Sequence, residues 1–250
     1  MLELRNISVT LEGDKDRVGI LHDVSLFLEK KKVYVITGPN GGGKSSLAKA
    51  IMGIYRTTGG QILLDGEDIS GMAIHERARK GIGYAFQQPP RFKGIKVREL
   101  LQMSAGLNMK VNPHGLLYDV GLCAQDYLDR EINASFSGGE LKRIEIASVL
   151  ARDLKVAIFD EPEAGIDLWS FQRLTETFRE MNEKRDTTIV IISHQERILQ
   201  LADEVILVSG GEIAEITTHE KVLGDIRKLD EACLCREDCD RKGWADAGCN

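Results

Sequence analysis

The stretch "VYVITGPNGGGKSS", residues 33–46, decides the fold. A short, mostly apolar segment leads into "GPNGGGKSS", which matches the phosphate-loop pattern G-x-x-x-x-G-K-[ST], and a helical pattern follows at once. Glycines let the backbone wrap around a phosphate without Cβ clashes, and the N–H groups of a helix N-terminus favour an anion. The order of strand, loop and helix therefore predicts a site for the phosphates of a nucleotide.

Two side chains of this loop have predicted roles. We expect Lys44 to reach the β- and γ-phosphates and the Ser45 hydroxyl to bind Mg²⁺. The alternative is a glycine-rich turn with a chance Lys-Ser pair, but the flanking strand and helix favour the phosphate site. The predicted nucleotide-binding residues of the phosphate loop are Gly38, Pro39, Asn40, Gly41, Gly42, Gly43, Lys44, Ser45 and Ser46.

A pair of acids ends a second apolar segment, "VAIFDEPEAGID", residues 156–167. Ligands bind at the carboxyl ends of strands in open α/β sheets. We therefore expect Asp160 to hold Mg²⁺ through its water shell and Glu161 to polarise an attacking water as general base. The alternative is a solvated pair of acids at a strand end, which the nearby phosphate loop makes less attractive.

The composition excludes several classes of protein. The chain has 250 residues, 42% of them hydrophobic, and a net charge of −6, which argues against a nucleic-acid partner because non-specific binding needs a basic surface. The N-terminus lacks the basic start and apolar core of a signal peptide, and no run of 18 apolar residues occurs. We therefore expect a cytoplasmic protein, with any membrane part on a separate chain.

Short apolar segments alternate with helical patterns along the chain. Residues 33–37, 156–160, 188–193 and 204–209 are rich in Val and Ile, as are strands buried on both faces of a parallel sheet. Helical patterns lie between them, for example at residues 46–54 and 170–184. This alternation predicts an α/β fold.

Other segments predict antiparallel strands. The first 30 residues alternate apolar and polar side chains, and residues 59–69 contain the turn dipeptide Asp65-Gly66. Residues 208–216, "VSGGEIAEI", have the same order of strand, turn and strand. Together these segments predict a smaller antiparallel sheet beside the parallel one.

The chain divides into a domain and a tail. We expect residues 1–225 to form one domain, with a helical subdomain inserted at about residues 89–152. Residues 89–133 contain few β-branched runs, which favours helices over strands. Residues 226–250 are polar, charged and rich in cysteine, which predicts a separate C-terminal tail.

Further motifs complete a family pattern. The chain has "FSGGE" at residues 136–140, Gln87 within "YAFQQPP", "EAGID" at residues 163–167 and His194 within "ISHQ". With the phosphate loop and the acid pair, their order resembles that of ATP-binding cassette (ABC) ATPases over about residues 2–223. The resemblance implies a P-loop NTPase cassette with a RecA-like parallel sheet core, an N-terminal antiparallel β subdomain and an inserted helical subdomain. It also implies hydrolysis of ATP to ADP and phosphate.

The signature segment, residues 136–140, implies a dimer. In this family the signature faces the phosphate loop of a second cassette. Here Ser137, Gly138 and Gly139 precede a predicted helix at residues 140–152, and their N–H groups and the Ser137 hydroxyl can bind a γ-phosphate. The resemblance therefore implies two copies, head to tail, with two ATP molecules between them. The alternative is a glycine-rich helix start capped by Ser137.

The resemblance assigns the remaining site residues. Gln87 is expected to contact Mg²⁺ and the attacking water, although its neighbour Gln88 leaves the assignment open. His194 is expected to hydrogen-bond the γ-phosphate, and Asp167 to communicate across the dimer.

Two kinds of work compete for this ATPase. The segments "YAFQQPP", "GIKVRELL", "FSGGELKRIEI" and "SHQERIL" resemble those of the Suf-type iron–sulfur cluster assembly ATPase, whose partner is a soluble scaffold protein. The alternative is the ATPase subunit of a transporter, docked on transmembrane subunits beside Gln87. The Pro of "DEPEAGID" and the short stretch between Gln87 and Ser137 favour the transporter, whereas the compact length and the thiol-rich tail favour iron–sulfur assembly, which is our interpretation.

Four cysteines crowd the tail. Cys233, Cys235, Cys239 and Cys249 have the spacing C-x-C-x₃-C-x₉-C, and such thiolates can bind Zn²⁺ or an iron–sulfur cluster. The neighbouring acids raise thiol pKa values and oppose thiolate formation. The alternative, a solvated tail without metal, stays open.

Overall fold

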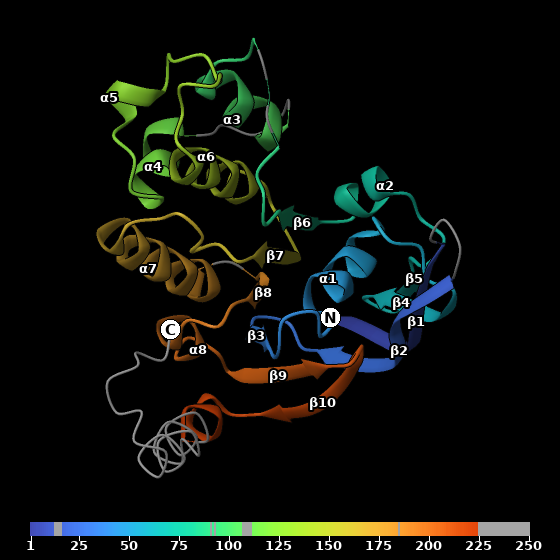
Figure 1. Ribbon diagram of the computed structural model, residues 1–250. Coiled ribbons are helices and arrows are strands. Elements are labelled where there is room, and N and C mark those ends of the chain that lie inside the picture. Colours follow the sequence, from blue (N-terminus) through green and yellow to red (C-terminus); the bar gives the residue numbers. More distant parts are fainter. Residues whose placement is uncertain (13–16, 91, 93, 107–111, 185, 225–250) are drawn as a thin grey trace, which may run out of the picture.

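Among the residues that the structure describes, the large sheet has six strands. A computed structural model describes residues 1–12, 17–90, 92, 94–106, 112–184 and 186–224 (Figure 1). The strand order is β10-β9-β3-β8-β7-β6, and all neighbours are parallel except β10 and β9. The strands are β3 (Val33–Thr37), β6 (Ile82–Ala85), β7 (Val156–Asp160), β8 (Thr188–Ile192), β9 (Glu204–Ser209) and β10 (Glu212–Thr217). The predicted α/β fold is confirmed.

Side chains on both faces of the central strands β3, β7 and β8 are buried. Along β3, Val33 and Val35 belong to one hydrophobic core, whereas Tyr34 and Ile36 belong to another. Successive strand residues point to opposite faces, so the large sheet separates the two cores. Continuous burial explains why β3, β7 and β8 have consecutive apolar residues rather than an alternation of apolar and polar ones.

A second, antiparallel sheet packs against one of these cores. Its order is β2-β1-β4-β5, with β1 (Leu2–Glu12), β2 (Arg17–Leu28), β4 (Gly59–Leu64) and β5 (Glu67–Asp68). The small antiparallel sheet is thus confirmed, but the prediction that residues 208–216 belong to it is wrong. β10 pairs with β9, and the other edge of β9 pairs in parallel with β3, so the hairpin extends the large sheet.

The helices form two groups. Close to the sheets lie α1 (Lys44–Met52), α2 (Ile74–Arg79), α7 (Leu168–Lys184) and α8 (Glu196–Leu199). The other four, which we call the helical lobe, gather at one end of the molecule in Figure 1. They are α3 (Val97–Ala105), α4 (Pro113–Asp119), α5 (Ala124–Tyr127) and α6 (Gly138–Leu150). The lobe shares a core with one face of the large sheet.

No helix among the described residues combines the length and the apolar composition needed to cross a bilayer. The predicted tail, with its four cysteines, lies outside the described residues.

Candidate nucleotide site

The phosphate loop, residues 38–46, connects β3 to α1 and needs its glycines. Gly38, Gly41 and Gly43 have positive φ angles of 136°, 76° and 104°. A Cβ atom on Gly38 would lie 2.1 Å from the carbonyl oxygen of Val208. No side chain caps the N-terminus of α1, and its first turn contains no acid. The first N–H groups of α1 therefore remain free to hold an anion.

Lys44 places a cation inside this loop. Its Nζ donates hydrogen bonds to the carbonyl oxygens of Gly38, at 2.8 Å, and of Pro39, at 2.9 Å. The side chain is buried, and burial lowers the pKa of the ammonium group, against the opposing charges of Glu161 and Asp160. The loop thus brings together the ammonium group of Lys44 and the N-terminus of α1, and both favour the binding of a phosphate group.

Asp160 and Ser45, two of the three predicted Mg²⁺ ligands, come from distant parts of the chain and lie together. The Ser45 hydroxyl donates to Asp160 Oδ1 at 3.0 Å, and the Tyr84 hydroxyl donates to Oδ2 at 2.8 Å. Asp160 is almost fully buried. Burial and the neighbouring Asp160 raise the pKa of Tyr84, which keeps the phenol protonated and able to donate. The sequence did not single out Tyr84, whose only signal is its place in the strand before "FQQPP".

Glu161 and Gln87 are also neighbours. Glu161 has a left-handed φ of 46°, and its N–H donates to the carbonyl oxygen of Ile192 at 3.0 Å. This backbone conformation is unusual for a residue other than glycine and fixes the direction of the side chain. Gln87 Nε2 donates to Glu161 Oε2 at 2.8 Å, so it is Gln87, rather than Gln88, that meets the acid.

His194 lies beside the last residue of β3, where the phosphate loop begins. Its Nδ1 is 3.3 Å from Oγ1 of Thr37, the residue immediately before Gly38. Burial first, and then the charge of Lys44, lower the pKa of His194, so the imidazole is neutral at pH 7. A neutral imidazole that accepts from Thr37 at Nδ1 carries its proton on Nε2.

Lys142 and Glu145 form a buried ion pair on α6, and this pair contacts the backbone of Phe86 and of Asp160. Lys142 Nζ donates to the carbonyl oxygen of Phe86 and, at 2.9 Å, to that of Asp160. Glu145 Oε1 accepts from the Phe86 N–H at 2.8 Å, and burial raises the pKa of Glu145 to about 7. The sequence interpretation missed both residues, because two charged side chains in "ELKRIEI" are typical of a solvated helix face.

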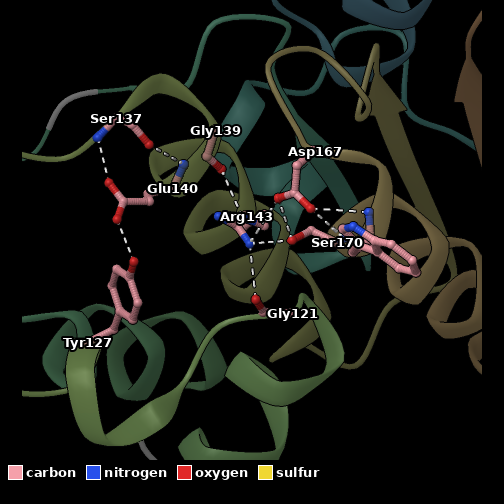
Figure 2. Close-up of polar contacts among 9 residues, drawn as sticks. Gly121, Tyr127, Ser137, Gly139, Glu140, Arg143, Asp167 and Ser170 are labelled. Atoms are coloured by element: carbon pink, nitrogen blue, oxygen red, sulfur yellow. Dashed lines mark hydrogen bonds and ion pairs between the residues drawn. The ribbon is translucent and has the colours of Figure 1, made fainter.

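The signature segment forms the N-terminus of α6. The Ser137 hydroxyl accepts from the Glu140 N–H at 3.2 Å, and Glu140 Oε2 accepts from the Ser137 N–H at 2.6 Å, which is a capping box. Tyr127 donates to the other oxygen of Glu140 (Figure 2). The helix therefore begins at Gly138 rather than at the predicted residue 140. Ser137 caps its N-terminus, as the alternative interpretation of this segment predicted.

The predicted residues fall into two separate groups. Ser137 and Gly138 are exposed, and Gly139 is buried. In the described part of the chain, no hydrogen bond or ion pair joins the signature segment to the phosphate loop. Figure 1 likewise shows α6 and α1 in different parts of the molecule. Lys44, Ser45, Asp160, Glu161, Gln87 and His194 form one group, and the signature residues form the other.

Asp167 belongs to the second group. Its Oδ1 accepts from the N–H groups of Trp169, at 3.1 Å, and Ser170, at 3.0 Å, and its Oδ2 accepts from the Ser170 hydroxyl at 2.7 Å (Figure 2). These hydrogen bonds lower the pKa of Asp167 and keep it ionised. Asp167 thus caps the start of α7 beside the signature segment.

Comparison with known proteins identifies this arrangement. Residues 21–164 match the ABC transporter family model. An uncharacterized ABC transporter ATP-binding protein of Methanocaldococcus jannaschii is 40% identical over 220 residues, which cover 84% of this chain and 86% of the relative. A probable ATP-dependent transporter of Synechocystis is 31% identical over 246 residues, with coverage of 88% and 93%.

Solved structures have the same fold. The dimeric, ADP- and phosphate-bound cassette MJ0796 superposes with a TM-score of 0.79 at 20% identity, covering 88% of this chain and 99% of that one. The protein cbiO1 of Clostridium perfringens, described as part of the ABC transporter complex cbiONQ, has a TM-score of 0.71 at 26% identity, with coverage of 92% and 94%. The chain belongs to the ABC transporter ATPase family and is an ATP-binding ATPase.

Proposed function

We propose that this chain is the ATPase subunit of an ABC transporter, and that two copies bind two ATP molecules head to tail. The observation that carries the proposal is the separation of the site into two groups. The phosphate loop has a cation and a free helix end, whereas Ser137 and Gly138 present a second, exposed helix end with no link to that loop. A second copy supplies what each loop lacks.

The first copy binds most of the nucleotide. Lys44 and the N–H groups at the start of α1 neutralise the β- and γ-phosphates. The Ser45 hydroxyl and the buried Asp160 carboxylate are hard oxygen donors that lie together, which suits Mg²⁺, an ion that takes few protein ligands besides phosphates and water. When bound, Mg²⁺ neutralises charge on the β- and γ-phosphate oxygens.

Hydrolysis uses the residues around Glu161. Its carboxylate takes a proton from the attacking water as general base, and Gln87 holds that carboxylate in place through the bond to Oε2. A neutral His194 in the tautomer that carries the proton on Nε2 donates to the γ-phosphate, while its Nδ1 accepts from the Thr37 hydroxyl. Phe86, the residue before Gln87, is hydrogen-bonded through its backbone to Lys142 and Glu145 of α6, and this contact couples the nucleotide state to a partner that docks on the helical lobe.

The second copy completes the site with its signature segment. The N–H groups of Gly138 and Gly139, which the capping box of Ser137 and Glu140 does not use, point the positive dipole end of α6, a helix of 13 residues, at the γ-phosphate. Hydrolysis removes the group that both copies hold, and the dimer opens. The dimeric MJ0796 cassette, of similar fold, supports this assembly.

A transporter partner is favoured by the relatives' names. Both the Methanocaldococcus and the Synechocystis relatives are described as transporter components, which supports the transporter alternative more than our sequence-based interpretation of iron–sulfur assembly. Iron–sulfur assembly remains the second candidate. The segment "FSGGELKRIEI", which resembles the Suf-type subunits, contains the buried Lys142 and Glu145. Both hydrogen-bond to the backbone of Phe86, the residue before Gln87.

The partner is tested by affinity purification of the Glu161→Gln chain with ATP from detergent-solubilised cells. The transporter proposal predicts a stoichiometric complex with transmembrane subunits whose presence stimulates the wild-type ATPase. A complex with a soluble scaffold protein that binds iron–sulfur clusters would replace it with the second candidate.

Metal content of the chain with and without residues 226–250 tests the proposed Zn²⁺ or iron–sulfur site at the four tail cysteines.

The dimer is tested by sedimentation of Glu161→Gln with Mg²⁺ and ATP. The proposal predicts a mass near twice 27.8 kDa with ATP and a monomer with ADP. Ser137→Arg in the same background is the matched variant, because it blocks the exposed signature but leaves the phosphate loop intact. A dimer that forms equally well with Ser137→Arg would contradict the head-to-tail arrangement.

A further inference from the structure

Arg143 joins three segments that are distant in sequence. It lies one turn after Gly139 in α6, and its side chain is only 13% exposed. Its Nη1 donates to the Gly121 carbonyl oxygen at 3.0 Å and to the Ser170 hydroxyl oxygen at 2.6 Å, and its Nε donates to the Gly139 carbonyl oxygen at 3.3 Å (Figure 2). One guanidinium therefore connects the helical lobe, the signature helix and the start of α7.

Ser170 extends this connection to Asp167. The hydroxyl that accepts from Arg143 donates in turn to Asp167 Oδ2 at 2.7 Å, and the Arg143 and Asp167 charges approach to 4.0 Å. Hydrogen bonds that involve a charged partner are stronger than neutral ones. The planar fork of arginine also reaches several acceptors at once, which a lysine ammonium does not.

The backbones around this side chain are in close contact. A Cβ atom on Gly139 would lie 2.1 Å from the Gly165 carbonyl oxygen, and one on Gly121 would lie 3.3 Å from the Ser170 hydroxyl oxygen. The D-loop segment, residues 163–167, therefore rests directly on the signature helix. No side chain fits between the two segments at this point, and Arg143 contacts both of them.

We infer that Arg143 is a positioning residue that sets the signature segment and Asp167 of its own chain for the nucleotide bound by the other copy. The inference rests on the proposed head-to-tail dimer. The partners of Arg143 are Gly121, Gly139, Ser170 and Asp167, and in the described part of the chain none of them belongs to the phosphate loop. Its loss therefore weakens hydrolysis at the partner's phosphate loop and leaves its own loop intact.

The single-variant experiment compares Arg143→Ala with Arg98→Ala. Arg98 pairs with Asp129 on the exposed side of the same lobe, so its variant controls for the loss of an arginine there. Arg143→Ala should lower kcat at least tenfold while the Kd of the monomer for ATP stays within twofold of wild type. Arg98→Ala should change neither. A wild-type kcat in Arg143→Ala, or a tenfold loss of monomer ATP affinity, overturns the inference.

Mixing variants tests whether the effect crosses between copies. A Lys44→Ala chain has a disabled phosphate loop but an intact signature group. A mixed dimer of Lys44→Ala with Arg143→Ala therefore contains one site with an intact loop and an intact signature. Its ATPase rate should exceed the sum of the two separate variants at least fivefold.

A parallel mixture separates this inference from the dimer itself. Lys44→Ala mixed with Ser137→Arg should also recover activity if the site is shared. If the mixture with Ser137→Arg recovers activity but the mixture with Arg143→Ala does not, Arg143 acts on the phosphate loop of its own chain. That result overturns the inference about Arg143 and leaves the shared site standing. No recovery in either mixture overturns the shared site and the inference with it. If Arg143→Ala melts well below wild type, Ser170→Ala, which removes the bridge to Asp167 and keeps Arg143, replaces it in the mixture.

Discussion

Replacing Lys142 with methionine should destabilise the protein strongly while keeping the side-chain volume. Lys142 is 1% exposed, and its Nζ lies 3.8 Å from Oε2 of Glu145, which is 8% exposed. It also donates to the carbonyl oxygens of Phe86 and Asp160. Removing one member of a buried ion pair typically costs about 3–5 kcal/mol, because the other charge stays buried without a partner. That is a large share of a typical domain's stability, about 5–15 kcal/mol.

The cost of Lys142→Met should rise with pH. Burial already raises the pKa of Glu145 from its ordinary 4.5 to about 7 in the folded state. A carboxyl whose pKa is raised by folding favours the folded state below its unfolded pKa, and this contribution is lost as pH rises through the folded pKa. Without Lys142 the folded pKa of Glu145 rises further, so the variant should lose more stability than wild type between pH 5 and pH 8.

Urea unfolding at pH 5 and pH 8 measures both effects. With a slope of about 3 kcal/mol/M, the Lys142→Met midpoint should fall by about 1 M or more at pH 8 and by less at pH 5. Lys142→Met with Glu145→Gln should recover part of the loss, because no unpaired charge remains and the amide still accepts from Phe86 N–H. Lys80→Met, which breaks an exposed pair with Glu67, should cost about 1 kcal/mol or less. A loss at pH 8 no larger than that of Lys80→Met would refute the reasoning.

Three further outcomes follow from the site. Glu161→Gln should lower kcat by about 10²–10⁴ and keep ATP affinity, measured by phosphate release and nucleotide titration; a rate within tenfold of wild type would remove Glu161 as general base. Gly38→Ala should abolish ATP binding, because its Cβ would meet the Val208 carbonyl oxygen at 2.1 Å, and an unchanged Kd would contradict that geometry. Chelation with EDTA should stop hydrolysis until Mg²⁺ is restored, and Asp160→Asn should raise the Mg²⁺ concentration needed for half-maximal rate; an unaltered requirement would exclude Asp160.

The parts of this site that depend on local backbone conformation could be predicted from the sequence. Glycine adopts the positive φ angles of the phosphate loop without a steric penalty, so the pattern in residues 38–46 identifies both the loop and the strand and helix beside it. The capping box of Ser137 and Glu140 is equally local, although it starts α6 at Gly138, two residues before the predicted start.

Long-range packing explains what the sequence did not predict. An alternating strand pattern reports half exposure but not the sheet to which the strand belongs, so the hairpin at residues 208–216 was assigned wrongly. Lys142 and Arg143 are consecutive charges on a helix, a pattern typical of a solvated face. Both are largely buried because the ends of β6 and β7 and the D-loop segment pack over them, contacts that span many residues of chain.

The dependence of ATPase rate on protein concentration tests the shared site most directly. If each nucleotide needs the phosphate loop of one copy and the signature of another, the rate per chain should fall steeply when wild-type protein is diluted below its dimerisation constant at saturating ATP and Mg²⁺. Adding excess Lys44→Ala chain, which supplies a signature group but no working loop, should restore it. A rate per chain that stays constant down to concentrations at which sedimentation finds only monomer would contradict the account.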